Sequence, residues 1–217
     1  MIVAMRKTAV IFVFFLLAGC GAQPFNENPA SSWTSLSSSP FLPSSPSSSV
    51  NTSNSLHYPI TDAQSRVTKK PFGIHVSPSS SPVTPERFTG FHTGEDFETF
   101  ENEQDSDVPI TAICNGKVRF RGWVKGYGGV MIQECTHLDQ AVTVLYGHLN
   151  IDSVTLQTGD ELTAGSLIGN LGKGYSKETD GERKHLHLAI HKGTTLNYRG
   201  YVQTEKELDP WINPFPF

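Results

Sequence analysis

Histidines and one aspartate recur in this sequence at spacings that suit metal chemistry. His92 and Asp96 lie four residues apart with Gly94 between them, so a tight loop could bring an imidazole and a carboxylate to one point. Further along, His185 and His187 alternate with leucines. Residues two apart in a strand face the same side at a spacing of about 7 Å, which suits one metal ligand beside one neighbouring imidazole. Taken alone, the first pair is weak evidence for a metal site, because such a spacing is common in polar loops, and the second pair could belong to an ordinary polar strand face.

A further histidine, His148, ends the sequence Tyr-Gly-His after an apolar segment. One carboxylate and several imidazoles without a cysteine cluster favour catalytic zinc over structural zinc, because catalytic zinc keeps three protein ligands and leaves one position for water. His92, Asp96 and either His185 or His187 would complete such a ligand set. The remaining histidines would be free to act as acid or base.

Together these motifs resemble the lysostaphin-type (LytM-like) zinc metalloendopeptidases, a family of peptidoglycan hydrolases. The resemblance covers residues 88–210 and implies an antiparallel β-sheet groove. It also implies that His92, Asp96 and His187 bind Zn²⁺ while His148 and His185 are catalytic, with their individual roles left open. The implied reaction is hydrolysis of amide bonds in peptidoglycan stem peptides or cross-links. The matching motifs are His92-x-x-x-Asp96, Tyr146-Gly-His148-Leu149 and His185-x-His187, with Pro109, Ala112, Gly116, Val118, Gly126, Tyr127, Gly128, Gly159, Asp160, Gly165, Ile168, Gly169, Gly172, Asp209 and Pro210 between and after them.

Two features depart from the family pattern. Some members carry a tyrosine near the zinc, whereas Phe88 and Phe91 precede His92 here, which leaves Tyr127 as a candidate. Residues 173–184 are rich in charge where many relatives have a shorter glycine-rich turn, and we expect this loop to form one wall of the groove. Residues 57–85 could in addition lie across the groove as an inhibitory segment.

Two other functions compete with the enzyme. The main alternative is a non-catalytic or latent regulator that activates another cell-wall hydrolase; relatives of that kind typically lose zinc ligands or catalytic histidines, whereas all five positions are filled here. The other is a zinc-sequestering lipoprotein, for which His-rich tracts would be expected. The histidines outside the motifs are expected at the surface, and two tryptophans are expected to be packing residues rather than a platform for a sugar. These residues are His57, His75, His137, His191, Trp123 and Trp211.

Short apolar segments with period-two alternation, bounded by turn residues, predict the β-strands that position these side chains. The glycines of residues 126–129 predict a hairpin turn between two of them. Since no convincing helix pattern follows the N-terminal signal, we predict an all-β, antiparallel fold. The predicted strands span residues 109–113, 117–122, 130–134, 141–146 and 185–190.

The N-terminus has the layout of a bacterial lipoprotein signal. Arg6 and Lys7 precede an apolar segment that is short for a membrane span, and Leu-Ala-Gly precedes Cys20. We therefore expect residues 1–19 to be removed and Cys20 to carry the lipid that anchors the protein in the cell envelope, on the extracytoplasmic side. Residues 20–57 are rich in serine and proline and predict a disordered linker, because they cannot bury enough apolar surface to offset ordering entropy. The metallopeptidase domain is then expected at residues 58–217.

Export leaves Cys114 and Cys135 able to form one disulfide, the alternative being two buried thiols. The whole chain of 217 residues has a formal charge of −4; removing Arg6 and Lys7 would leave 15 basic against 21 acidic residues, a charge of −6. Without a basic cluster or a glycine-rich phosphate loop, binding to nucleic acid or nucleotides is not expected. The expected partners are peptidoglycan and, through the lipid, a membrane, with the protein a monomer.

Overall fold

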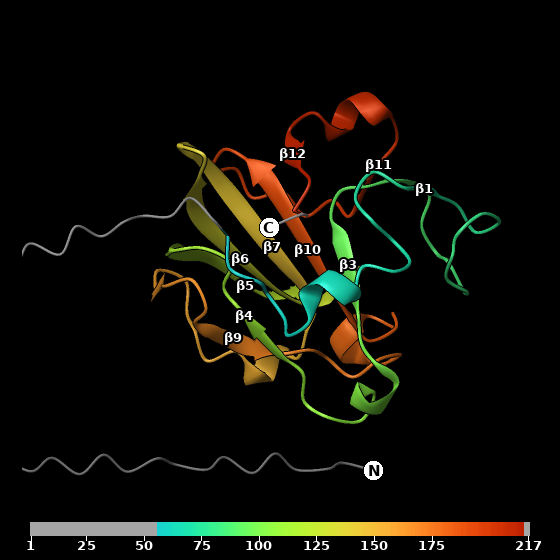
Figure 1. Cartoon of the computed structure of the whole chain (residues 1–217), viewed down its shortest axis with the longest axis horizontal. Coiled ribbons are helices and arrows are strands. Elements are labelled where there is room, and N and C mark those ends of the chain that lie inside the picture. Colours follow the sequence, from blue (N-terminus) through green and yellow to red (C-terminus); the bar gives the residue numbers. More distant parts are fainter. Residues whose placement is uncertain (1–55, 215–217) are drawn as a thin grey trace, which may run out of the picture. The chain divides into compact units, whose positions relative to one another are not determined.

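A computed structural model describes residues 56–214, which form an all-β fold (Figure 1). The predicted signal, Cys20 and most of the predicted linker lie outside the described residues. Within the described range, no helix is long and apolar enough to cross a membrane. The strands are β1 (His75–Val76), β2 (Gly90–His92), β3 (Glu95–Glu98), β4 (Pro109–Thr111), β5 (Gly116–Val124), β6 (Gly128–His137), β7 (Gln140–Leu149), β8 (Glu161–Leu162), β9 (Leu167–Asn170), β10 (His185–Lys192), β11 (Tyr201–Val202) and β12 (Trp211–Ile212). Short 3₁₀ turns span Ala63–Ser65, Glu101–Glu103, Ile151–Ser153, Lys177–Thr179 and Glu205–Leu208.

The main sheet is antiparallel and runs in the order β12-β10-β7-β6-β5-β8, with β3 also paired to β10. One edge of β10 pairs with β7, and its other edge is shared by β3 and β12. Figure 1 shows β6, β7 and β10 side by side in the middle of the sheet. Two smaller sheets, β1-β2-β11 and β4-β9, complete the fold. β2 ends at the first predicted ligand, so the site lies where the main sheet meets a small one.

Alternation along β10 separates an apolar face from the face that carries chemistry. Leu186, Leu188 and Ile190 belong to the larger hydrophobic core, whereas Ala189 belongs to a second, smaller cluster. His185 and His187 therefore share a face with Ala189, because residues two apart in a strand point the same way. The predicted orientation of the two histidines is confirmed. Burial of the intervening leucines is what holds this register.

All five predicted strand segments are strands. Four are longer than predicted, and the segment at 109–113 is shorter. The predicted hairpin turn between β5 and β6 is also confirmed, with Gly126 and Gly128 at φ +92° and +75°. β3 was missed because its sequence, Glu-Asp-Phe-Glu, is polar, yet all four residues are buried. The carboxylates of Asp96 and Glu98 pair with Arg183 inside the protein instead of facing solvent.

Cys114 and Cys135 are joined by a disulfide with their Cα atoms 6.2 Å apart. Both belong to the larger core. The two tryptophans differ: Trp211 is buried in the smaller core cluster, as a packing residue would be, whereas Trp123 is 46% exposed and belongs to neither core cluster. Trp123 instead donates its indole N–H to the carbonyl oxygen of Lys177 on the surface.

Residues 57–76 wrap along the edge of the domain. The amides of Asp96 and Glu98 in β3 donate to the carbonyl oxygens of Lys70 and Arg66. The buried Arg66 side chain makes two hydrogen bonds, of 2.6 and 2.8 Å, to the carboxylate of Glu103. This segment therefore covers an otherwise unpaired strand edge. Among residues 57–85, Lys70 alone lines the pocket that is described below.

Candidate metal centre

Three strands bring the predicted ligands together. His92 ends β2, a two-residue turn follows, and Asp96 lies in β3 directly opposite His187 of β10. Gly94 permits the turn, because a Cβ atom there would lie 2.4 Å from the carbonyl oxygen of Leu188. The four-residue spacing of His92 and Asp96 thus corresponds to one tight turn that packs closely against β10.

The ligand atoms of these residues form a nearly equilateral triangle. His92 Nε2 lies 3.0 Å from His187 Nδ1 and 3.2 Å from Asp96 Oδ1, and His187 Nδ1 lies 3.1 Å from Asp96 Oδ1. Tetrahedral zinc with bonds of about 2.0–2.1 Å separates its ligand atoms by about 3.3 Å. The donor set and its geometry therefore fit a zinc ion, and among the described residues this cluster could hold a metal.

Each ligand imidazole has a partner for its other nitrogen. His92 Nδ1 donates to the carbonyl oxygen of Pro71 at 3.2 Å. His187 Nε2 lies 3.4 Å from the hydroxyl of Tyr127, to which it donates when Nδ1 faces the metal. Such partners fix the tautomer and the ring orientation of metal-binding histidines. Tyr127, the candidate tyrosine, is therefore next to the site, where it supports a ligand.

The electrostatic surroundings keep the ligands in the forms that bind metal. Burial by itself would raise the pKa of Asp96, but the neighbouring His185, His92 and Arg183 hold this pKa well below the usual range. Burial also lowers the pKa of His187 to about 4, against the opposing effect of its hydrogen bond to Asp96. At neutral pH the site thus presents an ionised carboxylate and a neutral imidazole.

The two predicted catalytic histidines lie beside this cluster. His148 is the extra residue of a β-bulge in β7, between Gly147 and Leu149, and its φ of +63° turns its side chain toward His185. The rings of His148 and His185 have their centroids 4.2 Å apart. His185 Nε2 lies 3.3 Å from Asp96 Oδ2, whereas His148 Nδ1 is buried without a hydrogen-bond partner among the described residues. Burial, reinforced by the charge of His185, holds the pKa of His148 well below its usual value.

A pocket of about 320 Å³ opens at these side chains. Its lining includes Asp96, His148 and His185, together with Glu182 and Arg183 of the charged loop 173–184. The expectation that this loop forms a wall of the groove is confirmed.

Sequence reasoning missed Tyr201 and Lys70, which also line the pocket. The ring of Tyr201 lies 5.2 Å from that of His92, and its hydroxyl accepts a hydrogen bond from Lys70 at 3.0 Å. Lys70 in turn forms a buried ion pair with Glu86. Neither residue belongs to a recognisable motif. Tyr201 reaches the site only through the pairing of β11 with β2, which no local pattern in the sequence indicates.

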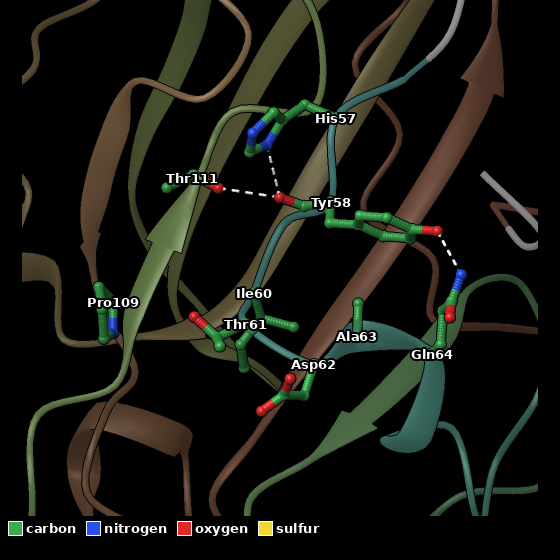
Figure 2. Close-up of a pocket in the computed structure, with 9 residues that line it drawn as sticks. All are labelled: His57, Tyr58, Ile60, Thr61, Asp62, Ala63, Gln64, Pro109 and Thr111. Carbon is green, nitrogen blue, oxygen red and sulfur yellow. Dashed lines mark hydrogen bonds between the residues drawn. The ribbon is translucent and has the colours of Figure 1, made fainter.

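The remaining histidines lie elsewhere. His75 contacts Phe91 edge-on and His191 contacts Trp211 in the same manner. His57 lines a separate hollow of about 430 Å³ beside β4, where its Nδ1 and the hydroxyl of Thr111 donate to the carbonyl oxygen of Tyr58 (Figure 2). That hollow carries none of the predicted site residues.

The sequence matches peptidase family M23 over residues 90–204, more than half of the chain, and the protein belongs to this family. Among solved structures, the catalytic domain of the antimicrobial peptidase lysostaphin from Staphylococcus simulans is 21% identical, with 67% of this chain and 86% of that chain covered and a TM-score of 0.45. CbpA from L. salivarius REN is 20% identical, with coverages of 74% and 92% and a TM-score of 0.49. A zinc containing peptidase from Vibrio cholerae is 20% identical, with coverages of 64% and 37% and a TM-score of 0.41. No match was found among curated proteins.

Proposed function

We propose that this protein is a zinc-dependent endopeptidase that hydrolyses amide bonds in the stem peptides or cross-links of bacterial peptidoglycan. The observation that carries the proposal is the triangle of ligand atoms from His92, Asp96 and His187, 3.0–3.2 Å apart, with two further imidazoles at the adjoining pocket. Membership of peptidase family M23 supports the same class of reaction. A zinc-sequestering lipoprotein would not require two further histidines beside the metal ligands.

When bound, zinc would supply Lewis acidity for the scissile carbonyl and its water. Burial lowers the pKa of His148, so this imidazole is neutral at pH 7 and has an unprotonated ring nitrogen that can accept a proton from the attacking water. His185 lies next to it, with its Nδ1 donating to the carbonyl oxygen of Arg183 and its Nε2 directed at the site. One of these two imidazoles then returns the proton to the leaving amine.

Tyr201 is suited to stabilise the oxyanion. Its hydroxyl accepts a hydrogen bond from Lys70, so its own proton remains available for donation. Burial raises the pKa of Tyr201, reinforced by the charge of Asp96, which keeps this proton in place at neutral pH. A fixed donor in a partly dehydrated pocket stabilises developing negative charge better than water does.

We also propose that the protein is lipid-anchored through Cys20 on the extracytoplasmic side of a membrane. Support comes from the basic residues, apolar segment and Leu-Ala-Gly-Cys sequence at the N-terminus. A serine- and proline-rich tether would let the enzyme reach an immobile polymer. Mass spectrometry of the N-terminal peptide from cells tests this: an unmodified Cys20, or a retained signal, would contradict it.

The decisive experiment is digestion of purified peptidoglycan by the full chain, in zinc and in chelator, with products identified by mass spectrometry. Chelator-sensitive release of defined stem peptides is expected, and the products would distinguish a D-alanyl cross-link from a glycine bridge. The His185→Ala variant serves as the matched control. If the zinc-loaded chain releases no peptide from peptidoglycan with D-alanyl cross-links or from peptidoglycan with glycine bridges, the proposed enzymatic function is wrong and a regulator is favoured.

A further inference from the structure

The metal-ligand carboxylate is held on its other oxygen by an arginine that the family motifs do not include. Asp96 Oδ1 faces His92 and His187, whereas Asp96 Oδ2 accepts a hydrogen bond of 2.8 Å from Arg183 Nη2. The two oxygens of one carboxylate therefore have separate partners. Asp96 is 2% exposed, so no water competes freely for either oxygen.

Arg183 is itself held rigidly. Its Nε lies 3.0 Å from each carboxylate oxygen of Glu98, and its Nη2 lies 2.5 Å from Glu98 Oε1. The guanidinium thus bridges Asp96 and Glu98, two residues on the same face of β3. Planar geometry allows this bridge, which a lysine ammonium cannot reproduce.

The next residue anchors the backbone at the same point. Lys184 is buried, and its ammonium group donates to the carbonyl oxygens of Glu103, Gln104 and Ser106. The side chains of both Arg183 and Lys184 therefore fix the end of this loop next to Asp96. This loop end closes the charged segment of residues 173–184.

From this geometry we propose that Arg183 is a positioning residue for the metal centre: it occupies Asp96 Oδ2, so that Asp96 binds zinc through Oδ1 alone. This inference rests on the proposed zinc site and extends it to a residue outside the ligand set. Arg183 Nη2 is the nearer of two neighbours of Oδ2, since His185 Nε2 lies 3.3 Å from the same oxygen; without Arg183, the carboxylate would lose the hydrogen bond that fixes its orientation.

Two effects of the guanidinium oppose each other. Its positive charge would repel a zinc ion, but Glu98 neutralises that charge at hydrogen-bond distance. The orientation of Asp96 is then the larger effect, because hydrogen bonds to ligating carboxylates are typically worth about 10- to 100-fold in metal affinity.

The test is the zinc dissociation constant of the full chain, measured by competition with a chromogenic chelator. Arg183→Met should weaken zinc binding about 10- to 100-fold, and Arg183→Lys should recover part of this loss, since a lysine offers one charge without the fork. Lys69→Met is the matched control, because Lys69 also pairs with Glu98, at 3.3 Å, but is not among the ion-pair partners of Asp96. The Lys69→Met variant should bind zinc like the wild type.

Thermal unfolding of each metal-free variant separates positioning from folding. A purely structural arginine would change the unfolding temperature and leave the zinc affinity of the folded chain unchanged. Folded Arg183→Met that binds zinc as tightly as the wild type overturns the proposal. If Arg183→Met does not fold, the same comparison is made with Arg183→Lys. A folded Arg183→Lys variant that binds zinc as tightly as the wild type would also overturn the proposal.

Because this measurement needs no substrate, its outcome is separable from that of the proposed function. A wild-type chain that binds zinc but does not cut peptidoglycan contradicts the enzyme and leaves the role of Arg183 open to the same assay. A wild-type chain that binds no zinc contradicts both.

Discussion

The geometry divides the five residues of the proposed site into two groups, for which we propose different tasks. His92, Asp96 and His187 converge on one point, whereas His148 and His185 face each other beside it with ring centroids 4.2 Å apart. Removing a ligand should therefore abolish metal binding. Removing a flanking imidazole should leave the metal and impair proton transfer.

This division gives the first prediction. His148→Ala and His185→Ala are each expected to lower kcat by about 10²- to 10⁴-fold with zinc content unchanged, because general acid–base groups contribute that much. His92→Ala is expected to lose both zinc and activity. Peptidoglycan digestion and metal analysis on the same samples check this, and zinc loss from His148→Ala would refute the division of tasks.

A second prediction concerns Glu86, which forms a buried ion pair with Lys70 at the pocket wall. Burial alone would raise the pKa of Glu86, but hydrogen bonds from Lys70, Phe88 N–H and Ser81 outweigh burial and lower it. A lowered folded-state pKa means that Glu86 contributes stability above its unfolded pKa, about 4.3, and loses it as pH falls through the lower folded value.

The free energy of unfolding of the wild type should therefore fall in this acidic range, and that of Glu86→Gln should fall less. Urea unfolding at several pH values below about 5, in chelator, measures both. Parallel pH profiles for the two chains would show that Glu86 contributes nothing to the acid sensitivity.

Among the elements, β10 has the central position because it contacts β7 on one edge and β3 on the other. This arrangement sets His187 opposite Asp96 and places His185 near the bulge of β7 that carries His148. The bulge interrupts the alternation of side chains along β7 and directs His148 toward the pocket. A one-residue change in the β7 register would direct a different side chain at the pocket.

The segment before β2 acts as a structural edge for β3, which leads to a third prediction. Arg66 is 2% exposed and donates to Thr61 O, Glu98 O and the Glu103 carboxylate. Arg66→Met should lower the free energy of unfolding by about 3 kcal/mol, because it leaves these partners without their donor.

Lys117→Met is the control for this change, since Lys117 is 52% exposed and its pair with Glu161 should contribute at most about 1 kcal/mol. Denaturant unfolding of the three chains provides the comparison. Equal stability of Arg66→Met and Lys117→Met would mean that the side-chain contacts of Arg66 contribute no more to the fold than an exposed ion pair does.

For the molecule as a whole, the metal would tie three strands, β2, β3 and β10, into one unit. The fourth prediction is that zinc raises the free energy of unfolding by about 2.7 kcal/mol when its free concentration is 100 times the dissociation constant. Thermal unfolding in zinc and in chelator measures this shift. His187→Ala should show no zinc-dependent shift, and a shift equal to that of the wild type would place the ion elsewhere.

The chain has a formal charge of −4, which would become −6 after removal of the predicted signal, and this charge bears on how the proposed enzyme would meet peptidoglycan. A negative protein gains no long-range attraction toward an anionic wall, so recognition would depend on contacts inside the groove. The charged loop 173–184 contributes both signs there, through Glu182 and Arg183.

Much of this fold and site could be predicted from the sequence because the informative patterns are local. Period-two alternation in residues 185–190 predicted a strand, the side on which His185 and His187 lie, and the burial of the leucines between them. The order and spacing of the motifs indicated the family. Strand β3 could not be predicted in this way, because three of its four buried residues are acidic and give no apolar alternation.

Only the tertiary structure decided which distant residues meet. Arg183 reaches Asp96 across 87 positions of sequence, and Tyr201 reaches His92 through the pairing of β11 with β2. Such contacts depend on strand register, on one bulge at His148 and on where a loop is anchored. No local pattern encodes them, because each is set by the packing of elements that are far apart along the chain.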